Sequence, residues 1–437
     1  MKRNEGANAK DVRPHLLLIT DGWPYGQGEK PFIEPELGKL QERFDVTVVS
    51  TATDEVASND KLKSVVPEGV RLVREPRPSR FALAFGSLSI LASRFGRAEL
   101  WTALTSGAHR VRRATEVLLF WAKAQHMAKF LENDGLAGWA DIMYGFWLNY
   151  YSLAFILLEM RGLRPKTCAR AHGYDLYNER CSGGRQPFHR LLARTLGRIF
   201  FVSDKGRNYF DKTFCDGESN GARLETRYLG ARPTVSVEVV PPQGKTDTFT
   251  VVSCSNVIPL KRVDLIAEGI AASGIADYRW VHFGDGSDMP RVKEVAARAG
   301  VHVSWMGRRP NSDVLGWFGS NRADVFVTTS SSEGLPVSVQ EAMSFGVPVV
   351  ATDVGGMSEL IDGNGILVSP NPSPSEVGDA LRRIDVARRT GEWDDMAQRS
   401  LELWRDRFDS EANATAFADE LARWAVDGGT EEKSSTL

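Results

Sequence analysis

Residues 325–351 read VFVTTSSSEGLPVSVQEAMSFGVPVVA, in which two apolar runs enclose a polar loop and a helical pattern. The outer runs, Val325–Thr329 and Val347–Ala351, are rich in valine and carry no charge, as expected of strands buried in a parallel sheet. Between them, Pro336 suits the first turn of a helix and Gly346 suits its end. The stretch therefore predicts a strand, a loop, a helix and a second strand, which is the repeating unit of an α/β fold.

The same alternation extends through the rest of the second half of the chain. Strands are predicted at Phe249–Ser253, Tyr278–Phe283 and Val301–Trp305. A helical pattern follows each of them, at Arg262–Ile270, Pro290–Ala299 and Ser312–Gly319, and further helices are predicted at 374–390 and 410–426. This rhythm predicts a parallel sheet with helices on both faces.

The first half begins in a similar way. The predicted strand His15–Thr20 runs into the glycine-rich loop Asp21–Lys30, and a helical pattern follows over Phe32–Phe44. Further strands are predicted at 46–50, 141–145, 167–171 and 198–203. The chain is therefore predicted to be an α/β protein with two Rossmann-like, doubly wound domains.

The length of the chain supports two domains, since 437 residues exceed one ordinary core. We expect an N-terminal domain over 1–240 and a C-terminal domain over 246–409, joined by a linker near Pro241–Lys245 that is rich in proline and glycine. The helix 410–426 is expected to pack back toward the N-terminal domain, and 427–437 to form a disordered tail.

Composition narrows the class of protein. Apolar residues make up 42% and charged residues 25%, as in soluble globular proteins, and the net charge of -2 gives no general reason to expect a nucleic-acid partner. The four cysteines show no zinc-ligand spacing and are interpreted as reduced thiols of a cytoplasmic protein. No apolar run approaches the roughly 18 residues that a membrane span needs.

The loop before the predicted helix at Pro336 has the features of an anion site. Gly334 permits close approach to the backbone, and the free N–H groups at a helix N-terminus attract negative charge. Glu333 precedes the helix, and Glu341 lies five residues beyond Pro336, or roughly 7.5 Å along the axis. Two carboxylates so placed can bracket a ligand with a diphosphate in the middle and hydroxyl-bearing rings at both ends, which is the layout of a nucleotide sugar.

A second loop is expected to reach the same place. Lys261 and Arg262 follow the first predicted strand of this domain. Ligands bind at the carboxyl ends of strands in parallel sheets, so Lys261 is expected to converge with Glu333. A fixed cation there can stabilise the charge that develops on a departing diphosphate.

Glu333, seven intervening residues and Glu341, within a Ser-x-x-Glu-Gly-Leu-Pro context, resemble the signature of family 4 retaining glycosyltransferases. That family has the GT-B fold, in which two Rossmann-like domains face each other across a cleft. The resemblance covers most of the chain, because other segments occur in the family's order: Gly26–Glu29, Arg170–Asp175, Pro259–Lys261, Gly284–Gly286, Met306–Arg308, Gly355–Gly356 and Gly365.

The resemblance implies a role for each matching residue of the C-terminal domain. Glu333 would contact the transferred sugar, with the backbone N–H groups of Gly334 and Leu335 near its hydroxyls or the phosphate. Glu341 would bind the ribose hydroxyls and Lys261 the diphosphate.

Further positions follow from the same resemblance. Backbone around Gly307 and Arg308 would hold the base, and His172, at the end of an N-domain strand, would lie near the reacting sugar. Gly26 and Gly28 would let the first loop approach the phosphate and the acceptor.

One position departs from the family's pattern. Asn256 stands where the family usually has an arginine, so one diphosphate contact is missing from its usual place. We hypothesise that Arg262 replaces it; if Arg262 does not, donor affinity and activity are in doubt.

Structural explanations compete with some of these roles. Lys261 alone would more often be a solvated charge at a helix start, and His172 a strand-end histidine that bonds to backbone. Gly26 and Gly28 are equally suited to plain turns, and Asp175 is expected to shape the turn after its strand.

The predicted activity is retaining, metal-independent transfer of a hexose-type sugar from a UDP- or GDP-sugar to a lipid-linked or polysaccharide acceptor. No cofactor or metal is expected, because no DxD-like motif stands out. Two alternatives stay open, a nucleotide-sugar 2-epimerase and a non-catalytic nucleotide-sugar-binding partner in a polysaccharide assembly complex. Missing acid/base residues disfavour the first, and Asn256 is the only support for the second.

Residues 71–130 have a different composition. Basic side chains outnumber acidic ones there and alternate with aromatic and leucine residues in helical patterns. Such helices can lie on an anionic membrane, here the inner face of the plasma membrane, or can be an ordinary solvated basic face over an apolar one. Helical periodicity does not separate these interpretations.

Overall fold

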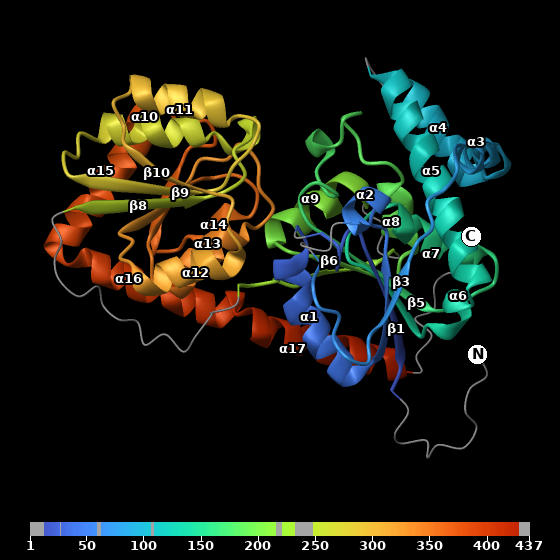
Figure 1. Cartoon of the computed structure of the whole chain (residues 1–437). Coiled ribbons are helices and arrows are strands. Elements are labelled where there is room, and N and C mark those ends of the chain that lie inside the picture. The colour runs from blue at the N-terminus through green and yellow to red at the C-terminus, as the bar shows by residue number, and fades with distance from the viewer. Residues whose placement is uncertain are drawn as a thin grey trace. The chain divides into compact units, whose positions relative to one another are not determined.

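The computed structural model describes residues 13–26, 28–58, 63–105, 109–215, 221–231 and 248–427. The chain forms two compact units, one from Met1–Arg227 with Ala414–Leu437 and the other from Tyr228–Asn413 (Figure 1). The predicted linker Pro241–Lys245 lies outside the described residues, and so does the predicted tail after Asp427. Each unit contains its own parallel sheet.

The sheet of the first unit has seven strands in the order β3-β2-β1-β4-β5-β6-β7, and every neighbouring pair is parallel. Its first strand in the sequence, His15–Thr20, is buried on both faces, because Leu17 and Ile19 enter one core and Leu16 and Leu18 the other. The strands are β1 (His15–Thr20), β2 (Asp45–Ser50), β3 (Arg71–Arg74), β4 (Ile142–Gly145), β5 (Lys166–Ala171), β6 (Arg198–Phe201) and β7 (Arg223–Thr226).

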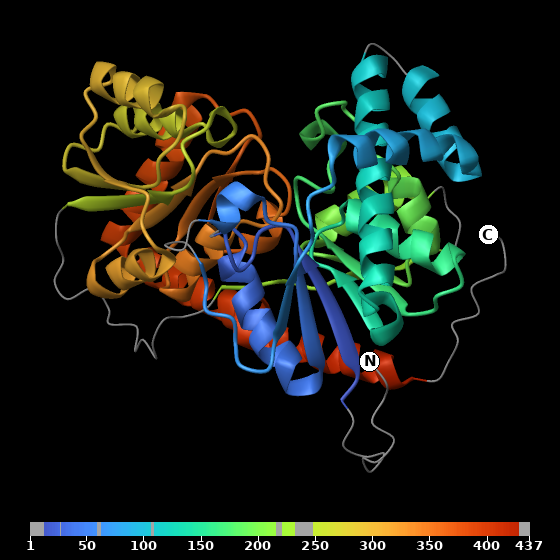
Figure 2. The ribbon, with the colours of Figure 1, turned by 45° about the vertical axis from the view of Figure 1, so that its right-hand side comes forward.

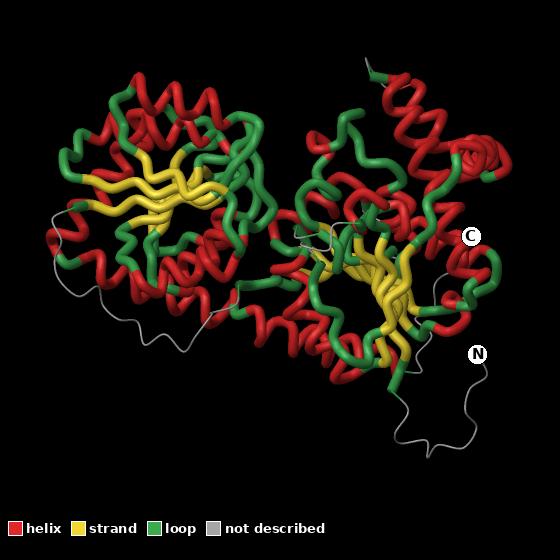
Figure 3. The backbone as a smooth tube through the Cα atoms, viewed as in Figure 1, coloured by secondary structure: helices red, strands yellow, loops and turns green. Residues whose placement is uncertain are grey.

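Helices cover both faces of this sheet (Figure 3). They are α1 (Lys30–Arg43), α2 (Asp54–Ala57), α6 (Leu136–Trp139), α7 (Tyr150–Met160), α8 (His189–Thr195) and α9 (Asp204–Phe214), with the short 3-10 helix η3 (Asn178–Arg180). The last helix of the chain, α17 (Ser410–Val426), also packs here: Phe417 and Leu421 join the core that contains Leu16.

An insertion between β3 and β4 consists of α3 (Arg80–Ser89), the 3-10 turn η2 (Ile90–Ala92), α4 (Arg94–Thr105) and the long α5 (Arg110–Asn133). α5 packs on α7, while α3 and α4 lie against α5 rather than on the sheet (Figure 2). The crossing of α3 and α5 is close, since a Cβ on Gly86 would lie 3.1 Å from the Cα of Ala122.

The sheet of the second unit has six parallel strands in the order β10-β9-β8-β11-β12-β13. They are β8 (Phe249–Cys254), β9 (Tyr278–Phe283), β10 (Val303–Gly307), β11 (Val325–Thr328), β12 (Val349–Thr352) and β13 (Gly365–Val368). Alternate residues of β11 enter opposite cores, Val325 and Val327 one and Phe326 the other. The prediction of two Rossmann-like α/β domains is confirmed.

The helices of the second unit are α10 (Val263–Ser273), α11 (Met289–Arg298), α12 (Asn311–Ser320), α13 (Val337–Ser344), α14 (Met357–Leu360), α15 (Pro374–Thr390) and α16 (Glu392–Leu403), with the short helices η4 (Pro259–Lys261) and η5 (Trp404–Phe408). One predicted strand is displaced: β10 begins at Val303, not Val301. The reason is that the Val301 amide donates to the Ala296 carbonyl at 2.8 Å and so still belongs to the end of α11.

Within the described ranges, the helices are all too short or too polar to cross a bilayer.

Candidate functional site

The carboxyl end of the second sheet brings together two loops that are 72 residues apart in the sequence. The Lys261 ammonium donates to Glu333 Oε1 at 2.5 Å, and the Ser331 amide donates to the Leu260 carbonyl at 2.9 Å. The Lys261 side chain is 21% exposed and that of Glu333 is 9% exposed. The two predicted residues therefore form an ion pair that is accessible from one side.

The Arg262 side chain donates mainly to backbone carbonyls. Its backbone is in the left-handed region with φ 46, and its guanidinium donates to the carbonyls of Thr329 at 2.6 Å, Ser330 at 2.9 Å and Pro370 at 2.8 Å. These bonds join the start of α10 to the loop after β11. In this structure most donors of the Arg262 guanidinium are taken by backbone carbonyls. Its contact with a diphosphate, in place of the missing arginine, stays a prediction.

The loop from Glu333 to Pro336 is fixed by a glycine pair. Gly355 has φ 54, and a Cβ there would lie 1.8 Å from the Glu333 carbonyl oxygen, so no other residue fits without displacing the loop. The Gly356 amide donates to the Gly334 carbonyl at 2.8 Å. Leu335 is partly buried against the core.

α13 begins at Val337 with Pro336 as its N-cap, which supplies no side-chain hydrogen bond to the first turn. Proline has no capping side chain, so the N–H groups of this turn keep the anion-binding character of a helix N-terminus. Binding of an anion at this turn stays a prediction.

Glu341 lies on α13 and is buried. Its Oε1 accepts a hydrogen bond of 2.6 Å from Asn311, the first residue of α12. Burial raises the pKa of the Glu341 carboxyl to about 7, and the bond from Asn311 opposes the shift. Glu341 is thus a buried carboxyl group beside the loop that follows β10.

The thiol of Cys254, the last residue of β8, lies near both the Lys261–Glu333 pair and the Asn311–Glu341 pair. Burial raises the pKa of this thiol to about 12, the charge of Glu341 raises it further, and that of Lys261 lowers it. Both charged groups must lie near the end of β8 to act on the same thiol. Lys261, Glu333 and Glu341 therefore surround one edge of the second sheet.

The other predicted donor residues occupy this edge or its margin. Gly307 ends β10 with φ 66, and its carbonyl accepts from the Gly284 amide at 2.9 Å. Arg308 and Asn256 are exposed. Their contacts with a donor stay predictions.

His172 directly follows β5 in the first unit. It is buried against Trp147, with ring centroids 4.0 Å apart, and neither ring nitrogen has a hydrogen-bond partner among the described residues. Asp175 accepts from the His172 amide and from the Leu148 amide, both at 2.8 Å. Asp175 shapes this turn, as expected, and its Oδ2 lies 3.6 Å from Nδ1 of His172.

The glycine-rich loop after β1 is organised by a residue that the sequence did not single out. The carboxylate of Glu29 accepts from the amides of Asp21 at 3.0 Å, Gly22 at 2.5 Å and Trp23 at 2.7 Å, and also from the Trp147 indole. The available signal for this role was a glutamate inside a glycine-rich loop. The indole that it accepts from is 118 residues away in the sequence, so local sequence could not predict that contact.

Asp21, the first residue of this loop, was also missed. It accepts a hydrogen bond of 2.7 Å from the Tyr174 hydroxyl, and burial raises the pKa of its carboxyl to about 6. Gly26 donates its amide to the Gly22 carbonyl at 2.9 Å, and a Cβ on Gly28 would meet nothing within 4 Å. Both glycines fit plain turns here, and their approach to a ligand stays a prediction.

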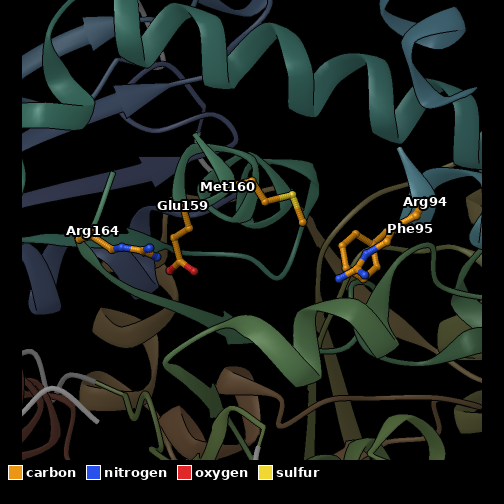
Figure 4. Close-up of a pocket in the computed structure, with 5 residues that line it drawn as sticks. All are labelled: Arg94, Phe95, Glu159, Met160 and Arg164. Atoms are coloured by element: carbon orange, nitrogen blue, oxygen red, sulfur yellow. The ribbon is translucent and has the colours of Figure 1, made fainter. Parts of the chain in front are cut away.

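A cavity of about 400 Å³ in the first unit lies away from these residues (Figure 4). Its lining comes from the start of α4, the end of α7 and the segment before β5: Arg94, Phe95, Glu159, Met160 and Arg164. Since Arg164 precedes β5, the cavity adjoins the amino end of that strand, opposite the end at which His172 lies.

In the part of the chain that the structure describes, histidine, cysteine and acidic side chains nowhere gather in threes as a metal site would require.

Comparison with known proteins matches residues 248–384 to the family of Glycosyl transferases group 1. An uncharacterized glycosyltransferase of Methanocaldococcus jannaschii is 27% identical over 51% of this chain and 60% of its own length. The O-antigen biosynthesis glycosyltransferase WbnH of Escherichia coli is 45% identical over 16% of this chain and 21% of its own. The chain thus spans less than two thirds of these curated relatives.

Solved structures match nearly the whole chain. A sucrose-phosphate synthase from Thermosynechococcus elongatus superposes with a TM-score of 0.69 at 13% identity, over 94% of this chain and 99% of its own. HepE of Anabaena, in complex with UDP, does so with a TM-score of 0.62 at 17% identity, over 94% of this chain and 100% of its own. These likenesses show the GT-B fold.

Proposed function

We propose that this protein is a retaining glycosyltransferase that moves a hexose-type sugar from a UDP- or GDP-sugar to a hydroxyl of a glycan acceptor in cell-surface polysaccharide biosynthesis. The observation that carries the proposal is the ion pair of Lys261 with Glu333 just before α13, together with the buried carboxyl of Glu341 on that helix. The matched family and the names of relatives such as WbnH and the Escherichia coli lipopolysaccharide 1,6-galactosyltransferase support the reaction and the acceptor class.

Donor binding would use the ion pair as an exchangeable contact. A diphosphate brings negative charge to the N-terminus of α13 and draws the Lys261 ammonium from Glu333 to its own oxygens. Glu333 is then free to accept hydrogen bonds from the hydroxyls of the sugar. Glu341 accepts from the ribose hydroxyls in place of Asn311.

In the transfer step the bond between C1 of the sugar and the phosphate oxygen breaks, and a bond from C1 to the acceptor oxygen forms on the same face. The acceptor proton passes to the departing phosphate, and Lys261 with the α13 N-terminus stabilises the charge left on the diphosphate. The family resemblance implies that His172 acts near the reacting sugar; its Nδ1 lies 3.6 Å from Asp175 Oδ2, and neither ring nitrogen has a hydrogen-bond partner among the described residues.

Incubation with radiolabelled UDP-, GDP- and ADP-sugars tests this proposal. We expect slow release of free sugar with one donor, and a loss of about a hundredfold in Glu333→Gln. Glu294→Gln, at an exposed glutamate of the same unit, serves as the control. An altered sugar that remains on the nucleotide would indicate an epimerase, and binding without turnover would indicate a non-catalytic partner; either outcome contradicts the proposal.

A further inference from the structure

Helix α3 is apolar but lies on the outside of the protein. Its sequence RFALAFGSLS carries a single charge, and none of its residues is buried. Phe81 is 77% exposed, Phe85 72% and Leu88 64%. Their spacing of four and three residues places them on one face of the helix.

The opposite face of α3 is the one that packs on the protein. Gly86 approaches Ala122 of α5 closely, the Ser87 hydroxyl donates to the Leu118 carbonyl at 3.4 Å, and the Trp121 indole donates to the Ser89 hydroxyl at 2.9 Å. Small and polar residues therefore face α5, and the phenylalanines face outward. This reverses the usual amphipathic arrangement, in which the large apolar side chains face the core.

The next segment of the insertion also exposes large apolar side chains. Leu91 follows α3 and is 56% exposed, while Trp101 of α4 is 70% exposed and Leu104 45%. Arg97 lies four residues before Trp101, and so on the same face of α4. We call this set the outer surface of the insertion: Phe81, Phe85, Leu88, Leu91, Trp101 and Leu104.

The charge around the outer surface is almost entirely positive. Residues 77–115 include one acidic residue, Glu99, and seven arginines: Arg77, Arg80, Arg94, Arg97, Arg110, Arg112 and Arg113. Glu99 is turned to the protein, because its carboxylate accepts from Arg185 at 3.3 Å and from the Phe188 amide at 3.2 Å. Arg113 is also turned to the protein, since it donates to the Gly183 carbonyl at 2.6 Å, whereas the other six arginines are exposed. The exposed side chains of the segment are therefore aromatic, aliphatic and cationic.

We propose that the outer surface docks on an anionic lipid bilayer, with its phenylalanine, tryptophan and leucine side chains in the boundary between headgroups and acyl chains. The arginines around it then contact lipid phosphates. The other interpretation of this segment is an ordinary amphipathic helix with a solvated basic face. Such a helix would bury its large apolar side chains and expose only its charged ones, whereas α3 exposes its large apolar side chains as well as its charge. The proposal goes beyond the sugar transfer and does not depend on it.

The charges favour a lipid surface over a second copy of this chain. A symmetric dimer through the outer surface would bring the same arginines face to face, and like charges repel in a desolvated contact. An anionic bilayer neutralises them instead, and attraction to its surface weakens as salt screens the charges.

Vesicle flotation tests the docking. The protein is mixed with phosphatidylcholine vesicles that contain or lack phosphatidylglycerol, at low and at high salt. We expect flotation with the anionic vesicles at low salt, and at least a tenfold weaker partition coefficient with phosphatidylcholine alone or in high salt. Absence of flotation with anionic vesicles at low salt overturns the proposal.

Two double variants separate the apolar and the ionic contributions. We expect Phe81→Ser with Phe85→Ser, and Arg77→Gln with Arg80→Gln, each to lower the partition coefficient at least tenfold, since one basic residue near the surface changes it about fivefold. Arg298→Gln with Arg383→Gln removes two exposed arginines from the second unit and should change it less than twofold. Equal partitioning of all three proteins overturns the proposal.

Self-association and donor binding are measured on the same proteins. A wild-type dimer that Phe81→Ser with Phe85→Ser converts to a monomer would identify the outer surface as a contact between copies, and would overturn the lipid proposal. Circular dichroism checks folding. Nucleotide-sugar affinity should be unchanged in both double variants, so a failure of membrane docking is distinguishable from a failure of the proposed transfer.

Discussion

The carboxyl edges of the two sheets both carry a glutamate in the loop that follows a strand, but the two glutamates differ in what they hold. In the first unit, the oxygens of Glu29 are occupied by three backbone amides and an indole. In the second, Glu333 holds one flexible ammonium, that of Lys261. The first arrangement builds a loop, whereas the second leaves a carboxylate that can exchange its partner for a ligand.

Different residues fix the shapes of these two loops, and this explains why only one glutamate is available to a ligand. Where Glu29 itself fixes the loop, it has no capacity left for a ligand. Where Gly355 and Arg262 fix the loop through backbone contacts, the side chains of Glu333 and Lys261 remain available. The comparison teaches how to recognise a candidate catalytic carboxylate: other residues fix the shape of its loop, so that its own oxygens remain available to a ligand.

The largest expected effect is on folding. Glu29→Ala leaves four donors without their acceptor, so we expect the free energy of unfolding to fall by about 4 kcal/mol. Urea denaturation followed by tryptophan fluorescence measures it. Glu34→Ala, which removes an exposed glutamate from the same region, should cost about 0.5 kcal/mol or less. Equal losses in the two variants would remove the contrast between Glu29 and an ordinary surface glutamate.

The next effect is on turnover. Lys261→Ala removes the cation that meets the leaving diphosphate, and we expect turnover to fall about a hundredfold, or about 2.7 kcal/mol in activation free energy. Unfolding should change much less, because the ion pair is accessible from one side. Lys293→Ala, an exposed lysine of the same unit, is the control. A large loss of stability with unchanged turnover would make Lys261 a structural residue like Glu29.

The smallest effect is on pH dependence. The pKa of Glu341 is raised to about 7 in the free protein, and ribose hydroxyls donate hydrogen bonds to the ionised form. Affinity for a nucleotide sugar should therefore fall about tenfold from pH 8 to pH 6, about 1.4 kcal/mol, when measured by calorimetry. Glu341→Gln should bind more weakly and show no such slope. A slope that persists in this variant would assign the titration to another group.

The same pKa predicts a change in stability with the opposite direction. Because the folded-state pKa of Glu341 lies above its ordinary value, its contribution is present below about pH 4.5 and is lost as pH rises through about 7. Glu341→Gln should therefore gain stability over the parent protein above pH 7.

The sequence predicted the layers of the fold well, because buried strands have a strong local pattern. β1 was predicted at its observed bounds, and the strand–loop–helix around Glu333 has the predicted order. Lys261 and Glu333 were expected to converge on topological grounds alone, since parallel strands present their carboxyl ends at one edge.

Contacts that depend on side-chain direction were not predictable in the same way. Nothing in the sequence indicated that the Arg262 guanidinium would donate to the Thr329 carbonyl, since that bond depends on the left-handed backbone of Arg262. The indole of Trp147, in the loop after the neighbouring strand β4, donates to Glu29, and no local pattern relates residues so far apart in the sequence. Burial of Glu341 was likewise invisible in the spacing of the two glutamates.

Because α17 packs on the first unit, the two units are completed at different times during translation. The second unit is one continuous segment, Tyr228–Asn413, so it has been made before Phe417 and Leu421 of α17. The first unit starts earlier but needs Phe417 and Leu421 to fill the core beside β1. At about 5–20 residues per second, the ribosome makes roughly 190 residues between β7 and α17, which takes on the order of ten seconds or more. The unit that is started first is therefore completed last. Until α17 is made, the apolar face of its sheet that α17 covers is exposed to water.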